Sequence, residues 1–177
     1  MTDKDAVGVA LLRDGFGRIR EGVVAVVEGL SPEELSWRVD RGANPLGWLV
    51  WHLSRQQDAQ VAHLGKLKSP WTTEWSDRLG LPYPRDAHGY GMSSQEVGQF
   101  KVSDGQLLVG YHEATYELTM RWLDSVDDDD WDRVIDRNWD PPVTVGMRAI
   151  SILEDSAKHL GQAEYVRGIL IRRRSTQ

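Results

Sequence analysis

Apolar residues recur at helical spacing in four long stretches of the chain, and no stretch shows the alternating pattern of a strand. The stretches cover residues 4–29, 44–67, 103–126 and 144–172. In the second stretch the apolar stripe consists of Leu46, Leu49, Val50, Leu53, Gln57, Val61 and Leu64. In the first stretch it consists of Val7, Leu11, Phe16, Ile19, Val23, Val26 and Val27. The pattern predicts an all-α four-helix bundle with no strands.

Capping signals support these boundaries. In LSPEELSW, Ser31 and Glu34 have the spacing of a capping box around Pro32, which predicts a short helix after the first long one. Asn44 is expected to cap the second long helix. Ser103 is expected to cap the third, and Thr144 the fourth.

The connection between the second and third long helices covers residues 68–102 and is rich in Gly, Pro and aromatic residues. One short helix is expected there, capped by Ser93 and Glu96. A connection of this length allows a crossover, so the two helices that it joins need not be antiparallel. The length of the chain predicts a single domain over residues 1–177.

Composition excludes several functional classes. The chain has 21 Lys+Arg against 27 Asp+Glu and a pI near 5.3, so no basic surface for nucleic acid is expected. No apolar run approaches the roughly 20 residues that span a bilayer. Asp3 and Asp5 stand where a signal peptide would be basic, which predicts a cytoplasmic protein. The absence of cysteine excludes a thiol nucleophile and thiolate metal ligands.

Residues 154–162, EDSAKHLGQ, contain the strongest candidate for chemistry. Asp155 and His159 are four residues apart, so their side chains lie on one face of a helix. His52, on the shoulder of the second helix's apolar stripe, is the best third ligand for a metal site with an open position. The alternative is a surface ion pair between Asp155 and His159, with His52 as an ordinary core or surface residue.

Three other histidines are weaker candidates. His63 shares a face with His52, but eleven helical residues separate them by about 16 Å, too far to share an ion. His88 lies in the connection between the second and third long helices. It either closes over a pocket or is an ordinary loop residue. His112 is expected to point into the bundle or lie on its surface.

Four segments carry a resemblance to a known family: WHLSRQQDAQVAHLG, HGYGMSS, WDPPVTVG and DSAKHLGQAEYVRG. In this order and spacing they resemble the DinB-like superfamily, especially its actinobacterial branch of mycothiol transferases. The resemblance implies a four-helix bundle with a crossover and a divalent metal held by His52, Asp155 and His159. Much of the superfamily has a histidine at the position of Asp155. The related mycothiol-dependent maleylpyruvate isomerases have a carboxylate there, the longer Glu.

The leading hypothesis is a metal-dependent S-transferase that conjugates a low-molecular-weight thiol, mycothiol, to an electrophile. Two imidazoles and one carboxylate suit Zn²⁺, with Ni²⁺, Fe²⁺ and Mn²⁺ as alternatives. Arg55 is a candidate to bind an anionic group, or is an ordinary surface arginine. Gln162 is a candidate to orient a metal ligand.

The same sequence is compatible with two other functions. The same three residues would serve a hydrolase that uses metal-bound hydroxide, although Glu154 points away from Asp155 and is poorly placed as a base. A non-catalytic bundle would bind a hydrophobic ligand in a Trp-lined groove, or act in a stress response. In that case Asp155 would pair with Lys158 or another cation, and His52 would pack against Trp48. A homodimer is expected from the frequency of symmetric pairs among such proteins.

Overall fold

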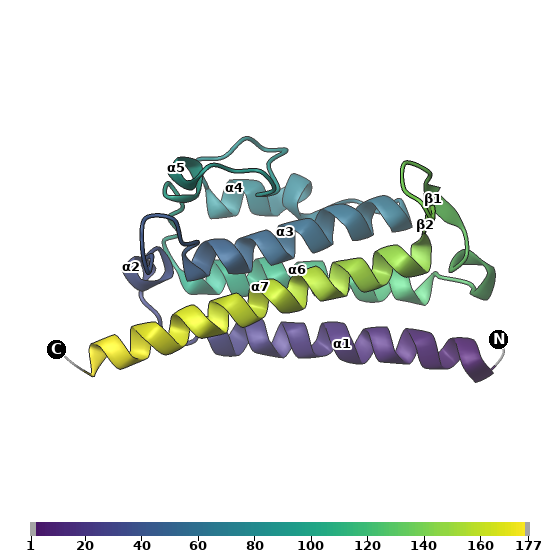
Figure 1. Ribbon diagram of the computed structural model, residues 1–177, viewed down its shortest axis with the longest axis horizontal. Helices are drawn as coiled ribbons and strands as arrows, with labels where there is room; N and C mark the ends of the chain where they lie inside the picture. Colours follow the sequence, from purple (N-terminus) through teal and green to yellow (C-terminus); the bar gives the residue numbers. More distant parts are fainter. Residues whose placement is uncertain (1–2, 176–177) are drawn as a thin grey trace.

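The computed structural model describes residues 3–175 and contains four long helices that lie side by side (Figure 1). They are α1 Asp3–Val27, α3 Leu46–Gly65, α6 Gly105–Asp124 and α7 Val145–Arg174. α3 packs against α6 and α7, and α1 packs against the same two helices. The predicted all-α bundle is therefore confirmed. Within residues 3–175, no helix combines the length and apolar character that a membrane span requires.

The crossover is visible in the directions of the helices. α3 and α6 run the same way, whereas α1 and α7 run opposite to them (Figure 1). The connection from α3 to α6 returns the chain to the end of the bundle where α3 begins (Figure 1). It contains the expected short helix α5 Ser94–Val97 and two elements that were not expected, the π-helical turn η1 Trp71–Trp75 and α4 Ser76–Leu79. Trp71 and Trp75 are buried, so this part of the connection is anchored in the core.

Most predicted caps are confirmed. Ser31 Oγ accepts a hydrogen bond from the Glu34 amide at the start of α2 Pro32–Leu35, and the Glu34 carboxylate accepts one from the Ser31 amide. A second capping box precedes α5. Thr144 caps α7 by accepting from the Met147 amide.

Two predicted caps are wrong. Pro45, not Asn44, is the residue that flanks α3, and no side chain caps this helix. Asp104, not Ser103, caps α6 by accepting from the Gln106 amide at 2.9 Å. The carboxylate of Asp104 also interacts favourably with the positive end of the helix dipole.

The prediction that the chain has no strands is also wrong. β1 Val134–Asp136 pairs antiparallel with β2 Val143–Thr144 immediately before α7. Strands of three and two residues are too short to show an alternating pattern in the sequence. The short 3-10 helix η2 Asp128–Asp130 leads from α6 into this hairpin.

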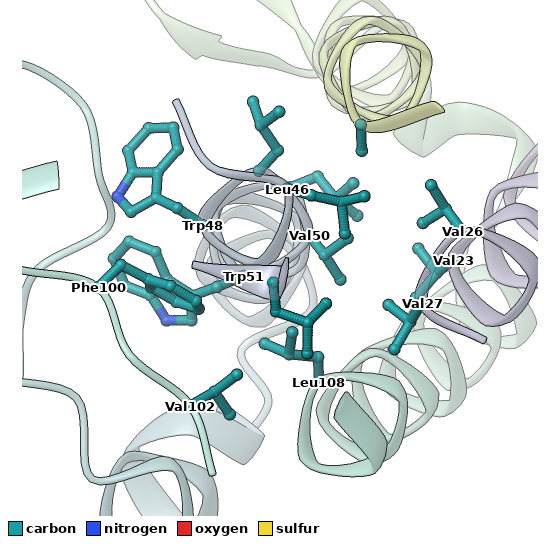
Figure 2. Packing of buried hydrophobic residues seen from close by; sticks show 14 of the residues in the cluster. Val23, Val26, Val27, Leu46, Trp48, Val50, Trp51, Phe100, Val102 and Leu108 are labelled. Atoms are coloured by element: carbon teal, nitrogen blue, oxygen red, sulfur yellow. The ribbon is translucent and has the colours of Figure 1, made fainter. Parts of the chain in front are cut away.

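The core extends across all four long helices, and Figure 2 shows one part of it. Val23, Val26 and Val27 of α1 lie across from Val50 of α3 and Leu108 of α6. All seven predicted stripe residues of α3 are buried.

The predicted stripe of α1 is correct from Phe16 onward, but Val7 and Leu11 are exposed because Leu12 faces inward instead. Every residue from Leu46 to Asp58 is buried, since α6, α7 and the connection cover α3 from different sides. Polar residues of α3 must therefore find partners inside the protein.

Candidate metal centre

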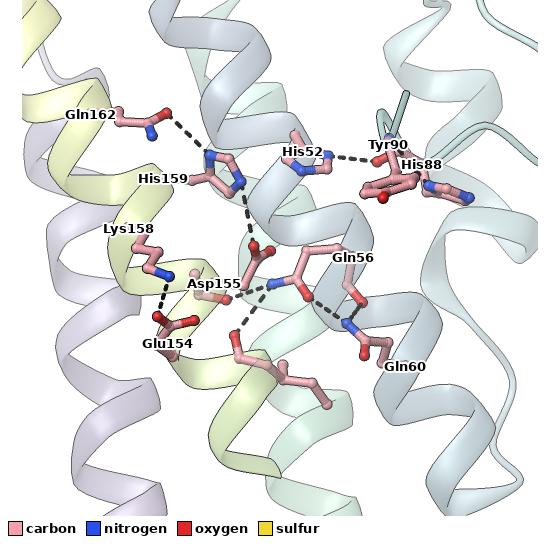
Figure 3. A network of polar contacts seen from close by, with 12 residues as sticks. His52, Gln56, Gln60, His88, Tyr90, Glu154, Asp155, Lys158, His159 and Gln162 are labelled. Atoms are coloured by element: carbon pink, nitrogen blue, oxygen red, sulfur yellow. Dashed lines mark hydrogen bonds and ion pairs between the residues drawn. The ribbon is translucent and has the colours of Figure 1, made fainter. Parts of the chain in front are cut away.

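His52, Asp155 and His159 come together where α3 packs against α7 (Figure 3). Each offers one ligand atom, and these atoms all lie within 4.8 Å of one another. His159 Nε2 and Asp155 Oδ1 are 3.5 Å apart. Neighbouring ligands of a tetrahedral zinc with bonds of about 2.0–2.1 Å are separated by about 3.3 Å. The size and chemistry of this cluster, which we call the His–Asp–His cluster, therefore fit a divalent metal.

Both imidazoles are oriented through their Nδ1 atoms. His52 Nδ1 lies 2.6 Å from the carbonyl oxygen of His88, and His159 Nδ1 lies 3.3 Å from Oε1 of Gln162 (Figure 3). The carbonyl oxygen of His88 only accepts, so Nδ1 of His52 carries a proton and donates it. In the neutral ring, Nε2 of His52 then keeps a free lone pair, the arrangement found in metal-ligating histidines. The sequence pointed to Gln162 but not to the carbonyl of His88.

Burial divides the cluster into a closed and an open side. His52 is 8% exposed, and its ring stacks on Trp48 at 4.8 Å and meets the edge of His159 at 4.6 Å. Burial lowers the pKa of His52, which favours the neutral imidazole that a metal requires. The side chains of His159 and Asp155 are 18% and 40% exposed. Solvent-sized molecules can therefore approach from the α7 side, as an open coordination position requires.

A separate polar network lies beside the cluster, along the interface of α3 and α7. Gln56 Nε2 donates to Ser156 Oγ at 2.9 Å, and Gln60 Nε2 donates to Gln56 Oε1 at 2.6 Å (Figure 3). Arg148 extends the network by donating to Gln60 Oε1. Sequence analysis did not identify these residues, although His52, Gln56 and Gln60 recur every four residues on one face of α3.

The remaining candidates have clear positions. Arg55 is neither a surface residue nor in contact with the cluster's ligand atoms: it is 6% exposed, and its Nε donates to the carbonyl of Ala87 at 3.0 Å. Lys158 pairs with Glu154, so the alternative pairing of Lys158 with Asp155 is wrong. Glu154 is engaged in this ion pair and is not one of the residues of the cluster.

The other histidines do not join the cluster. His63 is exposed, as is the ring of His88, whose carbonyl rather than its imidazole serves the site. His112 is 1% exposed and bonds to Ser54 on the opposite side of α3. Burial lowers the pKa of His112 to about 3, so it is a neutral core residue.

Comparisons with known proteins agree with the fold. A crystal structure described as a conserved protein of locus from Enterococcus faecalis matches with a TM-score of 0.86 and 28% identity, covering 92% of this chain and 96% of that chain. No curated protein matches the chain. The family model of the DinB superfamily matches residues 16–163, a range that includes the whole His–Asp–His cluster. The chain therefore belongs to the DinB superfamily.

Proposed function

We propose that this protein is a metal-dependent S-transferase that conjugates a low-molecular-weight thiol, mycothiol, to an electrophile. The observation that carries the proposal is the cluster of one ring nitrogen from each of two histidines and one carboxylate oxygen within 4.8 Å, open to solvent on one side. Zn²⁺ is the metal that best suits two imidazoles and a carboxylate, and Ni²⁺, Fe²⁺ and Mn²⁺ are alternatives. A divalent metal held there would lower the pKa of a bound thiol or water.

The protein's own residues have separate tasks in this proposal. His52, Asp155 and His159 hold the metal, while Gln162 keeps His159 oriented. Because the chain has no cysteine, the reacting sulfur comes from the second substrate. The thiol loses its proton to solvent, its sulfur forms a bond to the electrophilic carbon, and the leaving group departs with the electron pair of the broken bond.

A cleft beside the cluster is large enough for the substrates. Its volume is about 560 Å³, within the range of small-molecule sites. Gln162 lines this cleft and also contacts His159 of the His–Asp–His cluster. Leu49 and Val166 supply apolar surface, and Lys158 and Tyr165 supply polar groups. We propose that the electrophile binds here with its apolar part against Leu49 and Val166.

Metal content and thiol consumption test the proposal. We expect about one zinc per chain in the wild type and none in Asp155→Ala or His159→Ala. His63→Ala is the matched control, because His63 is an exposed histidine of α3 outside the cluster. Thiol consumption with a panel of electrophiles should stop when a chelator removes the metal. An unchanged rate after metal removal would contradict the proposal.

Hydrolysis by the same cluster is the second candidate, favoured by the 40% exposure of the Asp155 side chain, which leaves room for water. Ester hydrolysis without added thiol would support it over thiol transfer. A Trp-lined groove for a hydrophobic ligand has less support, because Trp48, Trp51, Trp71 and Trp75 are all buried. The homodimer stays a prediction.

A further inference from the structure

Side chains on one face of α3 hold the long connection between α3 and α6 in place through hydrogen bonds. His52, Arg55 and Asp58 are three residues apart in turn, so they lie along this face. Asp58 Oδ2 accepts from the amide of Trp71 and from Ser69 Oγ, both at 2.9 Å. This carboxylate fixes the beginning of the connection, and the two residues before it on this face bind a later part.

Three carbonyl groups in residues 85–88 each receive a hydrogen bond from a buried side chain. Trp71 Nε1 donates to the carbonyl of Arg85 at 2.7 Å, and Arg55 Nε donates to that of Ala87 at 3.0 Å. His52 Nδ1 donates to the carbonyl of His88 at 2.6 Å. Arg55 is itself held, since it is 6% exposed and its guanidinium lies 5.7 Å from the ring centre of Trp71. The backbone just before the carbonyl that meets His52 is therefore held in place by Trp71 and Arg55.

Gly89 brings this backbone against the imidazole. Its φ is +93°, in the left-handed region that favours glycine. A Cβ at this position would overlap Nδ1 of His52 and lie 3.0 Å from Cζ2 of Trp48. The ring of His52 has Trp48 stacked on it and Gly89 at its Nδ1 edge, a fit that a larger residue would destroy.

We infer that residues 85–89 form a backbone clamp that fixes the tautomer and ring orientation of His52, with Arg55 and Gly89 as its positioning residues. The clamp leaves Nε2 of His52 unprotonated beside Asp155 and His159. Its effect on metal binding rests on the proposed metal site, whereas its effect on the imidazole does not. This part of the connection therefore has a fixed position beside the proposed metal site.

The clamp can be tested without metal, by NMR of the histidine ring nitrogens in the metal-free protein. We expect His52 as the Nδ1-protonated tautomer in the wild type and a changed tautomer or an exchange-broadened signal in Gly89→Ala. Gly91→Ala is the matched control, because Gly91 also has a positive φ, +75°, but has open space around its Cβ position. It shares the backbone strain without the overlap, so it should keep the wild-type signal. An Nε2-protonated His52 in the wild type, or identical spectra for the two variants, would overturn the inference.

Metal affinity tests the consequence for the site. Loss of a group that orients a metal ligand typically costs about 10–100-fold in affinity. We expect that loss for Gly89→Ala and Arg55→Met, partial recovery in Arg55→Lys, and wild-type affinity in Gly91→Ala. Spectra of the cobalt-substituted protein should change in the first two variants, which a general loss of stability would not produce. Equal zinc affinities for Gly89→Ala and Gly91→Ala would refute the clamp while leaving the metal site standing. A wild type that binds no metal would refute the proposed function, and the NMR result would still decide the clamp.

Discussion

His52 of α3 and His112 of α6 lie on opposite sides of α3. Their surroundings distinguish a candidate metal ligand from a core residue. His52 faces α7, where His159 and Asp155 offer further ligand atoms and one side is open to solvent. His112, on α6, contacts Ser54 of α3 and is 1% exposed. Its Nε2 has no hydrogen-bond partner among the described residues. Burial lowers the pKa of both rings, but only the ring of His52 lies beside other groups that can ligate a metal.

The largest expected effect concerns the core histidine. The pKa of His112 is about 3 in the folded protein, against about 6.5 when unfolded. Below pH 6.5 the unfolded chain binds the extra proton, so the free energy of unfolding falls as the pH drops toward 3, by on the order of 4 kcal/mol. His112→Gln should remove this part of the acid dependence in urea unfolding measured between pH 7 and 4. His63→Gln, which alters an exposed histidine, should keep the wild-type slope; equal slopes in all three proteins would contradict the assignment.

Metal should stabilise the folded protein by binding at the His–Asp–His cluster, with no contribution from His112. Zinc at about 100 times its dissociation constant adds about 2.7 kcal/mol to the free energy of unfolding. We expect this gain in the wild type and in His112→Gln, and its absence in His159→Ala. Thermal unfolding with and without zinc measures it. A gain that persists in His159→Ala would place the metal elsewhere.

A smaller effect is expected from the residue that orients His159. Gln162→Ala removes the acceptor for His159 Nδ1 and should weaken zinc binding about 10-fold. The metal-free stability should hardly change, because Gln162 is exposed. Glu164→Ala is the control, an exposed position of α7 two residues away. Competition with a chromogenic chelator measures both, and equal affinities would show that Gln162 does not orient the ligand.

The smallest effect is expected at Glu154. Its ion pair with Lys158 is exposed, and such pairs contribute about 0.3–0.5 kcal/mol in helices. Glu154→Gln should therefore change the unfolding free energy by no more than about 0.5 kcal/mol. It should leave zinc affinity and turnover near the wild-type values. A large loss of turnover would instead identify Glu154 as a general base and favour hydrolysis.

Prediction from the sequence is correct where the information is local. The boundaries of the four long helices are within a few residues of the predicted ones, and the capping boxes at Ser31 and Ser93 are present. It failed where signals were short or ambiguous. The hairpin β1–β2 is too short to show a period, and Val7 and Leu11 share α1 with apolar neighbours that face inward instead.

The sequence by itself determined the helices and the pairing of Asp155 with His159, because helical geometry places residues four apart on one face. It also singled out His52 as a third ligand. Only the tertiary structure decided that His52 meets that pair, since the periodicity of one helix does not say which face of another helix it will contact. It also decided that the carbonyl of His88 and the backbone of Gly89 orient His52. Backbone groups are the same in every residue, so no pattern of side chains could have revealed this contact.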